Sequence, residues 1–326
     1  SFLNNRLTGT FDWYRRNTKD MLVAGATLPA TLGASVPKSN SADMKTIGWE
    51  LSLGWNDRLE NGFSYWVKGV LSDYQATITK YAGNDAGFYS QSDGDGKYYV
   101  GQKIGEIWGY HSNGLFQSDD EAATIDQSEL YAGKWGAGDV KYEDLDNDGK
   151  ITKGEETIYN PGDKSIIGNK TPRYQFGITV GFDYKNFDFE MFWQGTGKRD
   201  YMLSGAQFWG FTSQWDVPYT PALDYWTETN TDAYFPRPGW QNGGNRVTSD
   251  RYLQSAAYGR LKNLTVGYTI PKNLTTKWGI SRLRLYVTGE NLLTITPLND
   301  AFDPETLGGM TYPINRKVAI GLNLTL

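Results

Sequence analysis

The acidic segment Asp144–Glu155, DLDNDGKITKGE, has the residue types and the spacing of a calcium-binding loop. Aspartates occupy loop positions 1, 3 and 5, glycine position 6, an aliphatic residue position 8 and glutamate position 12, as in an EF-hand loop. Calcium is a hard cation that takes several oxygen ligands, and closely spaced carboxylates with a backbone carbonyl provide them. The predicted ligands are the side chains of Asp144, Asp146, Asp148 and Glu155 and the carbonyl of Lys150.

No strong helical pattern flanks this segment, so the sequence does not predict the paired helices of a calcium sensor. A solvated acidic turn is the simpler alternative. If calcium binds, we expect it to be structural and to hold together the long connection 75–171, which the strand pattern places on the extracellular side.

A second candidate site is an aromatic-rich stretch at residues 208–240. Aromatic rings stack on the apolar faces of sugars, and a loop at the mouth of a barrel presents them to a glycan. Packing of the rings within the loop is the more ordinary interpretation for each residue. The candidate substrate-binding residues are Trp209, Trp215, Trp226 and Trp240.

Composition argues against catalysis and against nucleic acid as a partner. The chain of 326 residues has no cysteine and a single histidine, His111, which excludes thiol chemistry and disfavours histidine-based triads and metal clusters. A net charge of -5 gives no electrostatic reason to bind nucleic acid. The glycine-rich stretches lack the strand-then-helix setting of a phosphate loop. We therefore predict that the protein is not an enzyme.

Strands must position these candidate sites, because hydrophobicity alternates with a period of two along much of the chain. In the last strand, Val318, Ile320 and Leu322 fall on one face, and Ala319 and Gly321 on the other. No run approaches the roughly 18 apolar residues of a membrane helix. A transmembrane barrel needs only every second residue to be apolar.

About eight such strands are predicted, and their connections alternate strictly in length. Outer-membrane barrels have short periplasmic turns and long extracellular loops, so the pattern predicts an all-β, antiparallel transmembrane β-barrel. A soluble β-sandwich is the alternative, but it has no reason to place all its long loops at one end. The short turns lie at 57–61, 185–186 and 271–280, and the long connections at 23–43, 75–171, 197–257 and 294–315.

The start of the chain has neither an initiating methionine nor the basic and apolar regions of a signal peptide. Eight strands can close a small barrel. Because the chain runs almost directly into its first strand, we instead interpret residues 1–326 as the later part of a longer protein. The strands are then one arc of a larger barrel.

Several stretches that together span the chain carry a family resemblance. They are WYRRNTKDMLV (13–23), IGWELSLGW (47–55), VGQKIGEIWGYHSNGLFQSDDE (100–121), GDVKYEDLDNDGKIT (138–152), SIIGNKTPRYQFGITVGFDYKNFDFEMFWQG (165–195), YGRLKNLTVGYTIP (258–271) and LRLYVTGENLLTIT (283–296). In this order they resemble the C-terminal part of SusC/RagA-like TonB-dependent transporters of the bacterial outer membrane. Leu326 departs from the pattern, because such barrels commonly end in an aromatic residue.

The resemblance implies a 22-stranded barrel in the outer membrane of a Gram-negative bacterium. An N-terminal plug, the TonB-contacting segment and the signal peptide would lie outside residues 1–326. It also implies a SusD-like surface lipoprotein that closes over the barrel as a lid, which gives the aromatic stretch an alternative role as a protein interface. Asp163 becomes an alternative final calcium ligand, because related loops often end in an aspartate just before the IGN segment.

The function implied is active import of nutrient molecules too large for porins, with oligosaccharides as the first cargo class and peptides as the second. The expected partners are the lipoprotein, TonB and membrane lipid. A calcium-stabilised extracellular β-domain that binds glycans without transporting them is the alternative from a different class. A passive porin is a third possibility, which only the resemblance disfavours.

Overall fold

The computed structural model describes residues 2–24, 31, 33, 37–81, 98–307, 312 and 314–326, and its main element is an antiparallel sheet of eight strands. The long strands are neighbours in the sheet in the order in which they follow one another along the chain. This confirms the predicted eight antiparallel strands. They are β1 (Leu7–Ala24), β2 (Lys38–Arg58), β3 (Ser64–Tyr81), β8 (Arg173–Tyr184), β9 (Phe187–Lys198), β12 (Tyr258–Thr269), β13 (Arg282–Ile295) and β14 (Lys317–Thr325).

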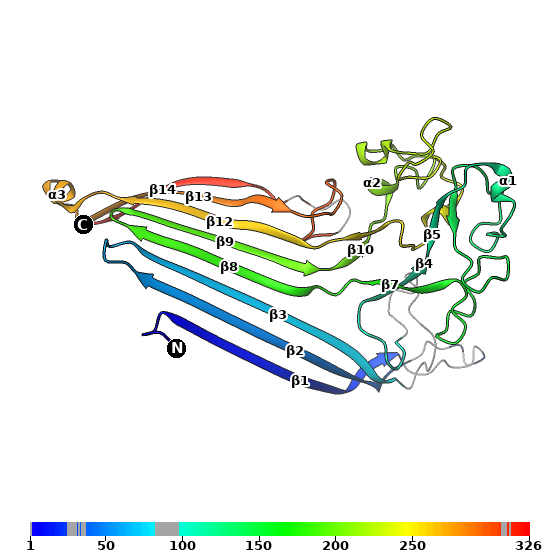
Figure 1. Cartoon of the computed structure of the whole chain (residues 1–326), viewed down its shortest axis with the longest axis horizontal. Helices are drawn as coiled ribbons and strands as arrows, with labels where there is room; N and C mark the ends of the chain where they lie inside the picture. Colours follow the sequence, from blue (N-terminus) through cyan, green and yellow to red (C-terminus); the bar gives the residue numbers. More distant parts are fainter. Residues whose placement is uncertain are drawn as a thin grey trace.

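The short and the long connections lie at opposite ends of the sheet (Figure 1). The turns after β2, β8 and β12 share one end with both chain termini, and the long connections gather at the other. The tightest turn is Lys185–Asn186, where Lys185 has a φ of 56°. Two-residue hairpins need this left-handed conformation because it matches the twist of the flanking strands.

The first three strands are longer than their apolar alternation predicts, at 18, 21 and 18 residues. About 9–11 tilted residues are enough to cross the hydrocarbon core of a membrane, so each of these strands is longer than one crossing requires. Consequently the predicted connections 23–43 and 75–171 begin or end within strands. The pattern missed these extensions because their apolar residues do not continue the exposed apolar face: Ala42, Ile78 and Tyr81 are buried in a separate small cluster. Residues 25–30, 34–36 and 82–97 lie outside the described residues.

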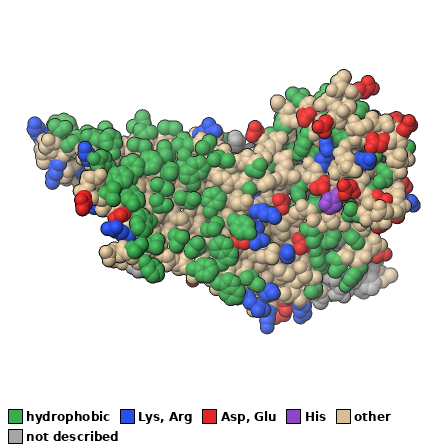
Figure 2. Space-filling model, in the orientation of Figure 1, with side chains coloured by type: hydrophobic (Ala, Val, Ile, Leu, Met, Phe, Trp, Pro, Cys, Tyr) green, Lys and Arg blue, Asp and Glu red, His purple; other side chains and the backbone are tan. Residues whose placement is uncertain are grey.

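The strand register joins the apolar positions into one continuous face. Val266 on β12 pairs with Phe189 on β9 and with Val287 on β13. Val287 pairs in turn with Ile320 on β14, whose side chain is 83% exposed. Figure 2 shows hydrophobic side chains covering this face of the strands. The sheet therefore presents a broad apolar surface on its outside.

Aromatic rings lie over glycines on the opposite, inner face. The Trp66 ring covers Gly181 of the neighbouring strand, and the Tyr286 ring covers Gly321. A Cβ atom at either glycine would collide with the ring. Glycine at these positions lets a large ring lie flat against the next strand without pushing the strands apart.

The long connections fold together into one packed unit, which we call the loop assembly (residues 98–171, 199–257 and 296–307). Its core contains buried side chains from all three segments, among them Tyr142, Phe208, Tyr252 and Phe302. Its elements are β4 (Glu106–Tyr110), β5 (Ser112–Leu115), α1 (Asp119–Ala122), β6 (Val140–Tyr142), β7 (Lys164–Asn169), β10 (Asp200–Met202), α2 (Ala206–Trp209), η2 (Thr220–Leu223), η3 (Gly243–Arg246) and β11 (Leu253–Ser255).

The turn after β12 contains α3 (Lys272–Thr275) and η4 (Thr276–Trp278). None of the helices in the described part of the chain is long and apolar enough to cross a membrane. The sheet is open, because β1 and β14 form its two edges. Long strands with unpaired backbone groups at an edge require further pairing, as the prediction of an arc of a larger barrel expects.

Candidate metal site and loop surface

The acidic segment forms a compact turn directly after β6, at the surface of the loop assembly. The Asp144 carboxylate accepts hydrogen bonds from the backbone N–H groups of Asp148 and Gly149, at 3.2 and 2.7 Å. Asn147 and Gly149 have φ values of 60° and 83°. Asparagine and glycine tolerate this left-handed conformation, and aspartate side chains bond readily to the backbone of tight turns. The local sequence therefore specifies the turn.

Asp163 completes this turn from the far end of the connection. Its side chain is fully buried, and its two carboxylate oxygens accept the backbone N–H groups of Leu145 and Thr152, both at 2.7 Å. One carboxylate oxygen from each of Asp144, Asp146 and Asp163 lies within 4.8 Å of the other two. Three carboxylates this close together can share one cation.

A tight bend at residues 153–162 returns the chain to Asp163. Gly154 and Gly162 have φ values of 56° and 59°. Their backbones touch, so a Cβ atom on either glycine would collide with the backbone nitrogen of the other. The N–H of Asp163 then donates to the carbonyl of Thr152 at 3.1 Å. Both glycines are therefore needed to place Asp163 beside the acidic turn.

The remaining predicted ligands lie outside this group of three. Asp148 accepts the backbone N–H of Lys150 at 2.8 Å, and Lys150, the predicted carbonyl ligand, forms a β-bridge with Asp126. Glu155 is exposed, and its carboxylate is not a member of the cluster that the described residues form. The structure therefore brings Asp163 to the place at which the EF-hand pattern expects Glu155.

The charges of the cluster act on one another. Burial, followed by the negative charges of Asp148, Asp163 and Asp144, raises the pKa of Asp146 above its ordinary value. Burial also acts to raise the pKa of Asp144, but the N–H donors of its turn outweigh burial and lower that pKa. Asp144 is therefore held as a carboxylate, and Asp146 is destabilised as one by its neighbours. A bound cation would remove that repulsion.

The predicted substrate-binding tryptophans divide into two pairs. Trp209 and Trp226 belong to the core of the loop assembly, with 9% and 8% of their surface exposed. Their faces are covered by other side chains and are not available to a sugar in this arrangement. Trp215 and Trp240 are 83% and 45% exposed. Only this second pair presents aromatic surface to solvent.

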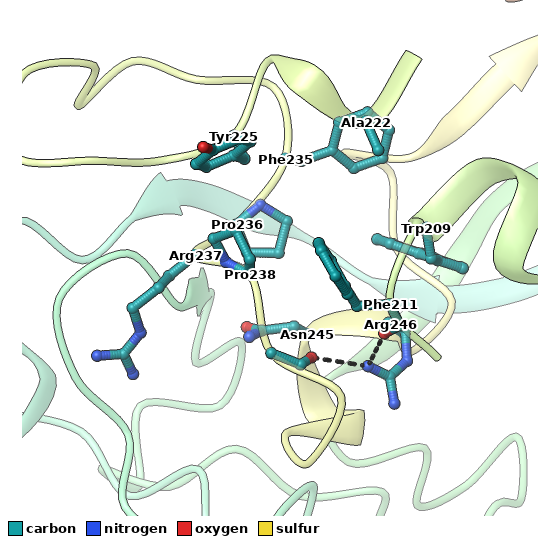
Figure 3. Close-up of a pocket in the computed structure, with 11 residues that line it drawn as sticks. Trp209, Phe211, Ala222, Tyr225, Phe235, Pro236, Arg237, Pro238, Asn245 and Arg246 are labelled. Carbon is teal, nitrogen blue, oxygen red and sulfur yellow. Dashed lines mark hydrogen bonds between the residues drawn. The ribbon is translucent and has the colours of Figure 1, made fainter. Parts of the chain in front are cut away.

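A small cavity lies beside Trp209 (Figure 3). Aromatic and proline side chains form its walls together with Arg246, which donates hydrogen bonds to the carbonyls of Phe211, Gly239 and Trp240. Burial lowers the pKa of Arg246. The cavity encloses only about 20 Å³, which is room for about one water molecule. It is therefore too small to bind a nutrient molecule.

Sequence reasoning missed a row of hydrogen-bonded side chains around His111. Its Nδ1 lies 2.8 Å from Asp250 Oδ2, and its Nε2 lies 2.7 Å from Ser165 Oγ. Serine hydrolases use the same order of side chains, but their nucleophile sits on a sharp, exposed turn. Ser165 lies within strand β7, and Asp250 also accepts the backbone N–H of Ser112. We interpret the row as a cross-link between distant segments. Nothing in the sequence near any of the three residues predicts that they come together.

No family model matches the chain. The chain is 29% identical to the TonB-dependent receptor P3 of Formosa agariphila, over 99% of this chain and 33% of that protein. It is 26% identical to the TonB-dependent receptor SusC of Bacteroides thetaiotaomicron, over 99% of this chain and 30% of SusC. The chain thus spans about a third of the length of the curated relatives that it matches.

Solved structures of a related fold cover nearly the whole chain. A structure of the RagAB peptide transporter matches 98% of this chain and 34% of its own, with a TM-score of 0.73 at 21% identity. The "open-open" state of the RagAB peptide importer matches 99% of this chain and 33% of its own, with a TM-score of 0.72 at 20% identity. At such identities these structures establish the fold. Over nearly its whole length, the chain is similar to SusC-like TonB-dependent receptors.

SusC-like receptors are β-barrel proteins of the outer membrane of Gram-negative bacteria. The open sheet of this SusC-like chain is therefore part of a transmembrane barrel wall, as predicted. Its continuous apolar face contacts lipid, and its polar face lines the lumen.

Proposed function

We propose that this SusC-like chain is the C-terminal part of an importer that takes up nutrient molecules across the outer membrane. The main support is that the sheet has an apolar outer face and a polar inner face. Its long connections also form one packed assembly at a single end of the sheet. Such a wall separates lipid from an aqueous path, and the assembly stands at its mouth. A soluble glycan-binding domain would have no use for the exposed apolar face.

The partners that we propose are a SusD-like surface lipoprotein at the mouth and TonB, acting through a part of the protein outside this chain. Relatives named TonB-dependent receptors support the second partner. Exposed apolar side chains of the loop assembly support the first: Trp215, Val217 and Leu223, which lie close together in the sequence, are 83%, 76% and 63% exposed. Large exposed apolar side chains of this kind are used in protein interfaces.

Oligosaccharides are the first cargo class that we propose. The supporting observation is that Trp215 and Trp240 present aromatic surface outside the core of the loop assembly. Peptides are the second class, and the support is that the matched RagAB structures are described as a peptide transporter. Import of either cargo needs binding and conformational change rather than bond cleavage, so the proposed role is not enzymatic.

We further propose that the acidic cluster binds a structural calcium ion. Asp144, Asp146 and Asp163 would hold it, with Asp148 beside them. The ligands fit calcium, because all of them are hard carboxylate oxygens. A cation would also offset the burial and the repulsion from neighbouring carboxylates that raise the pKa of Asp146. The ion would supply the positive charge that fixes residues 144–163 as one unit of the loop assembly.

A transport assay with the full-length receptor tests the proposed function. A strain that lacks the receptor should lose uptake of one defined glycan or peptide pool, and a strain that lacks TonB should lose the same uptake. Calorimetry of the purified receptor–lipoprotein pair against both pools then assigns the cargo class. Uptake that persists without TonB would contradict active import and favour a passive porin.

A further inference from the structure

A recess of about 600 Å³ lies beside the tight turn Lys185–Asn186, and residues of β3, β8, β9, β12 and β13 line it. This turn joins β8 to β9 at the end of the sheet that holds both termini, opposite the loop assembly (Figure 1). The volume is within the usual range of sites for small ligands. Cargo that enters at the loop assembly would therefore reach this recess last.

Strand register places the polar lining of the recess on the inner face of the sheet. Trp66 on β3 pairs with Gly181 on β8, and Gly181 pairs with Glu190 on β9. Glu190 pairs in turn with Thr265 on β12. The same row continues through β13 to Ala319 on β14, whose side chain lies opposite the lipid-contacting face. Residues that pair directly point to the same face of a sheet, so Trp66, Glu190 and Thr265 face the lumen.

The Trp66 ring forms a fixed platform in this recess. One side of the ring lies against Gly181, where a Cβ atom would collide with it. Trp66 is partly exposed and lines the recess, so its remaining surface is open to the lumen. An aromatic ring held in this way can stack on the apolar face of a sugar ring.

Hydrogen-bonding groups surround the platform. Glu190 and Asp183 are exposed and line the recess, and neither side chain forms an ion pair or a hydrogen bond in the described part of the chain. Asp188, by contrast, accepts two hydrogen bonds from Arg284. A guanidinium has five N–H donors, so Arg284 keeps further donors for a ligand. The recess therefore offers both acceptors and donors.

The charges of the recess cancel, because three acidic and three basic side chains line it. A recess without net charge does not attract an ion from a distance. An uncharged sugar fits both features of the lining, because its ring has an apolar face and its hydroxyl groups donate and accept hydrogen bonds. The six charged residues are Asp183, Asp188, Glu190, Lys185, Arg282 and Arg284.

We propose that this recess is a binding subsite for a neutral oligosaccharide on the barrel wall, at the end opposite the loop assembly. One sugar ring stacks on Trp66, its hydroxyl groups donate hydrogen bonds to Glu190 and Asp183, and Arg284 donates to a hydroxyl oxygen. The subsite holds cargo that has left the mouth and has not yet left the barrel. The inference rests on the proposed import of oligosaccharides and adds a second place at which they bind.

Protection of a cysteine in the full-length receptor, purified in detergent, tests the subsite. Thr269 lines the recess and residues 1–326 contain no cysteine, so Thr269→Cys adds a single thiol to this part of the receptor. A water-soluble maleimide should label this thiol in the free receptor, as read by mass spectrometry of its peptide. A mixture of linear neutral oligosaccharides of glucose, xylose, mannose and fructose should protect it. Thr10→Cys, on the inner face of β1 and outside the recess, should be labelled equally with and without sugars.

Two substitutions in the Thr269→Cys receptor then test the lining. Trp66→Leu with Glu190→Gln removes the ring and one acceptor, and should raise the sugar concentration for half protection roughly tenfold or more. The matched control, Tyr14→Leu with Glu50→Gln, removes a ring that also covers a glycine and an inner-face glutamate outside the recess, and should leave that concentration unchanged. Glu190→Gln alone keeps the ring over its glycine and should raise the concentration roughly threefold or more, so the test does not depend on the folding of the double variant.

Three results would overturn the proposal. Equal protection in the lining variant and its matched control would show that the ring and the carboxylate do not bind sugar. A Thr269→Cys thiol that the maleimide cannot reach in the free receptor would show that another part of the receptor fills the recess. Protection by short neutral peptides as strong as that by the sugars would remove the preference for glycans.

Failure of this subsite can be told apart from failure of the proposed function. The protection assay uses the purified receptor without TonB, whereas the transport assay compares strains with and without TonB. Sugar uptake that depends on TonB, with no protection of Thr269→Cys, would leave the importer in place and overturn the subsite alone.

Discussion

The carboxylates of Asp144 and Asp163 meet in one cluster, with oxygens less than 4.8 Å apart, although the residues lie at opposite ends of the acidic connection. Backbone N–H groups hold both of them: those of Asp148 and Gly149 hold Asp144, and those of Leu145 and Thr152 hold Asp163. The protein backbone therefore arranges the carboxylates in advance. A cation that enters the cluster would complete this arrangement by removing the repulsion among the carboxylates.

Replacement of Asp163 by asparagine should weaken calcium binding far more than replacement of Glu155 by glutamine. Asp163 belongs to the cluster and bonds to two backbone N–H groups, whereas Glu155 is exposed and outside it. Hydrogen bonds to a charged group contribute about 1.5–3 kcal/mol, so the calcium dissociation constant of the Asp163→Asn receptor should rise roughly tenfold or more. Calorimetric titration of the metal-stripped receptor measures it, and Glu155→Gln is the matched control. A larger loss in the Glu155→Gln receptor would restore the EF-hand assignment.

Removal of calcium should loosen the acidic turn and leave the barrel wall unchanged. The backbone N–H groups of Leu145 and Thr152 are held by Asp163, and mutual repulsion of the carboxylates grows when no cation is present. Hydrogen exchange with and without a chelator, read by mass spectrometry, should show faster exchange at residues 144–163 only. Peptides from β9 are the internal control. Unchanged exchange in the turn would mean that it is a solvated acidic loop.

Gly181→Val should destabilise the barrel by about 1–3 kcal/mol, the usual cost of overpacking. A Cβ atom at Gly181 collides with the Trp66 ring, so the ring must leave its place on the inner face. Gly69→Val is the matched control, because Gly69 lies in the same pair of strands and has open space around the Cβ position. Urea denaturation followed by the heat-dependent gel shift of the folded barrel compares the two receptors. Equal losses would show that the ring contact has no energetic role.

Ile320→Lys should impair barrel folding, and Ala319→Lys should be tolerated. Ile320 pairs with Val287 on the lipid-contacting face, whereas Ala319 pairs with Thr288 on the inner face. A lysine on the lipid face costs about 2–4 kcal/mol at the bilayer midplane, and substitutions that face the lumen avoid this cost. Folding yield into lipid vesicles, measured by protease resistance, separates the variants. The reverse order of effects would mean that the two faces have been assigned wrongly.

Patterns among residues that are close in sequence were sufficient to predict the strands of the barrel wall. Alternation in Val318–Leu322, the two-residue turn at Lys185–Asn186 and the separation of short from long connections each depend on residues that are neighbours in sequence. They predicted the number and order of the strands and which side chains lie on the apolar face. The pattern missed the ends of β1–β3 on the long-connection side, because the apolar residues there are buried in a small cluster that forms only when the three strands pack together.

The candidate sites were only partly predictable for the same reason. The aspartates and the glycine of the acidic turn are close in sequence, so their spacing alone indicated a metal site. The choice between Asp163 and Glu155 depends on the bend that Gly154 and Gly162 allow, which spacing cannot report.

By itself, the sequence determined a sheet with one face for lipid and one for water, because a strand turns alternate side chains to opposite sides whatever surrounds it. Tertiary structure alone decided which aromatic rings are buried. Trp209 and Trp226 enter a core that three distant segments build together, and Trp215 stays outside it. The same holds for the hydrogen bonds that join His111 to Ser165 and to Asp250. Burial and contact between remote segments depend on the packing of the whole chain, and no local pattern contains that information.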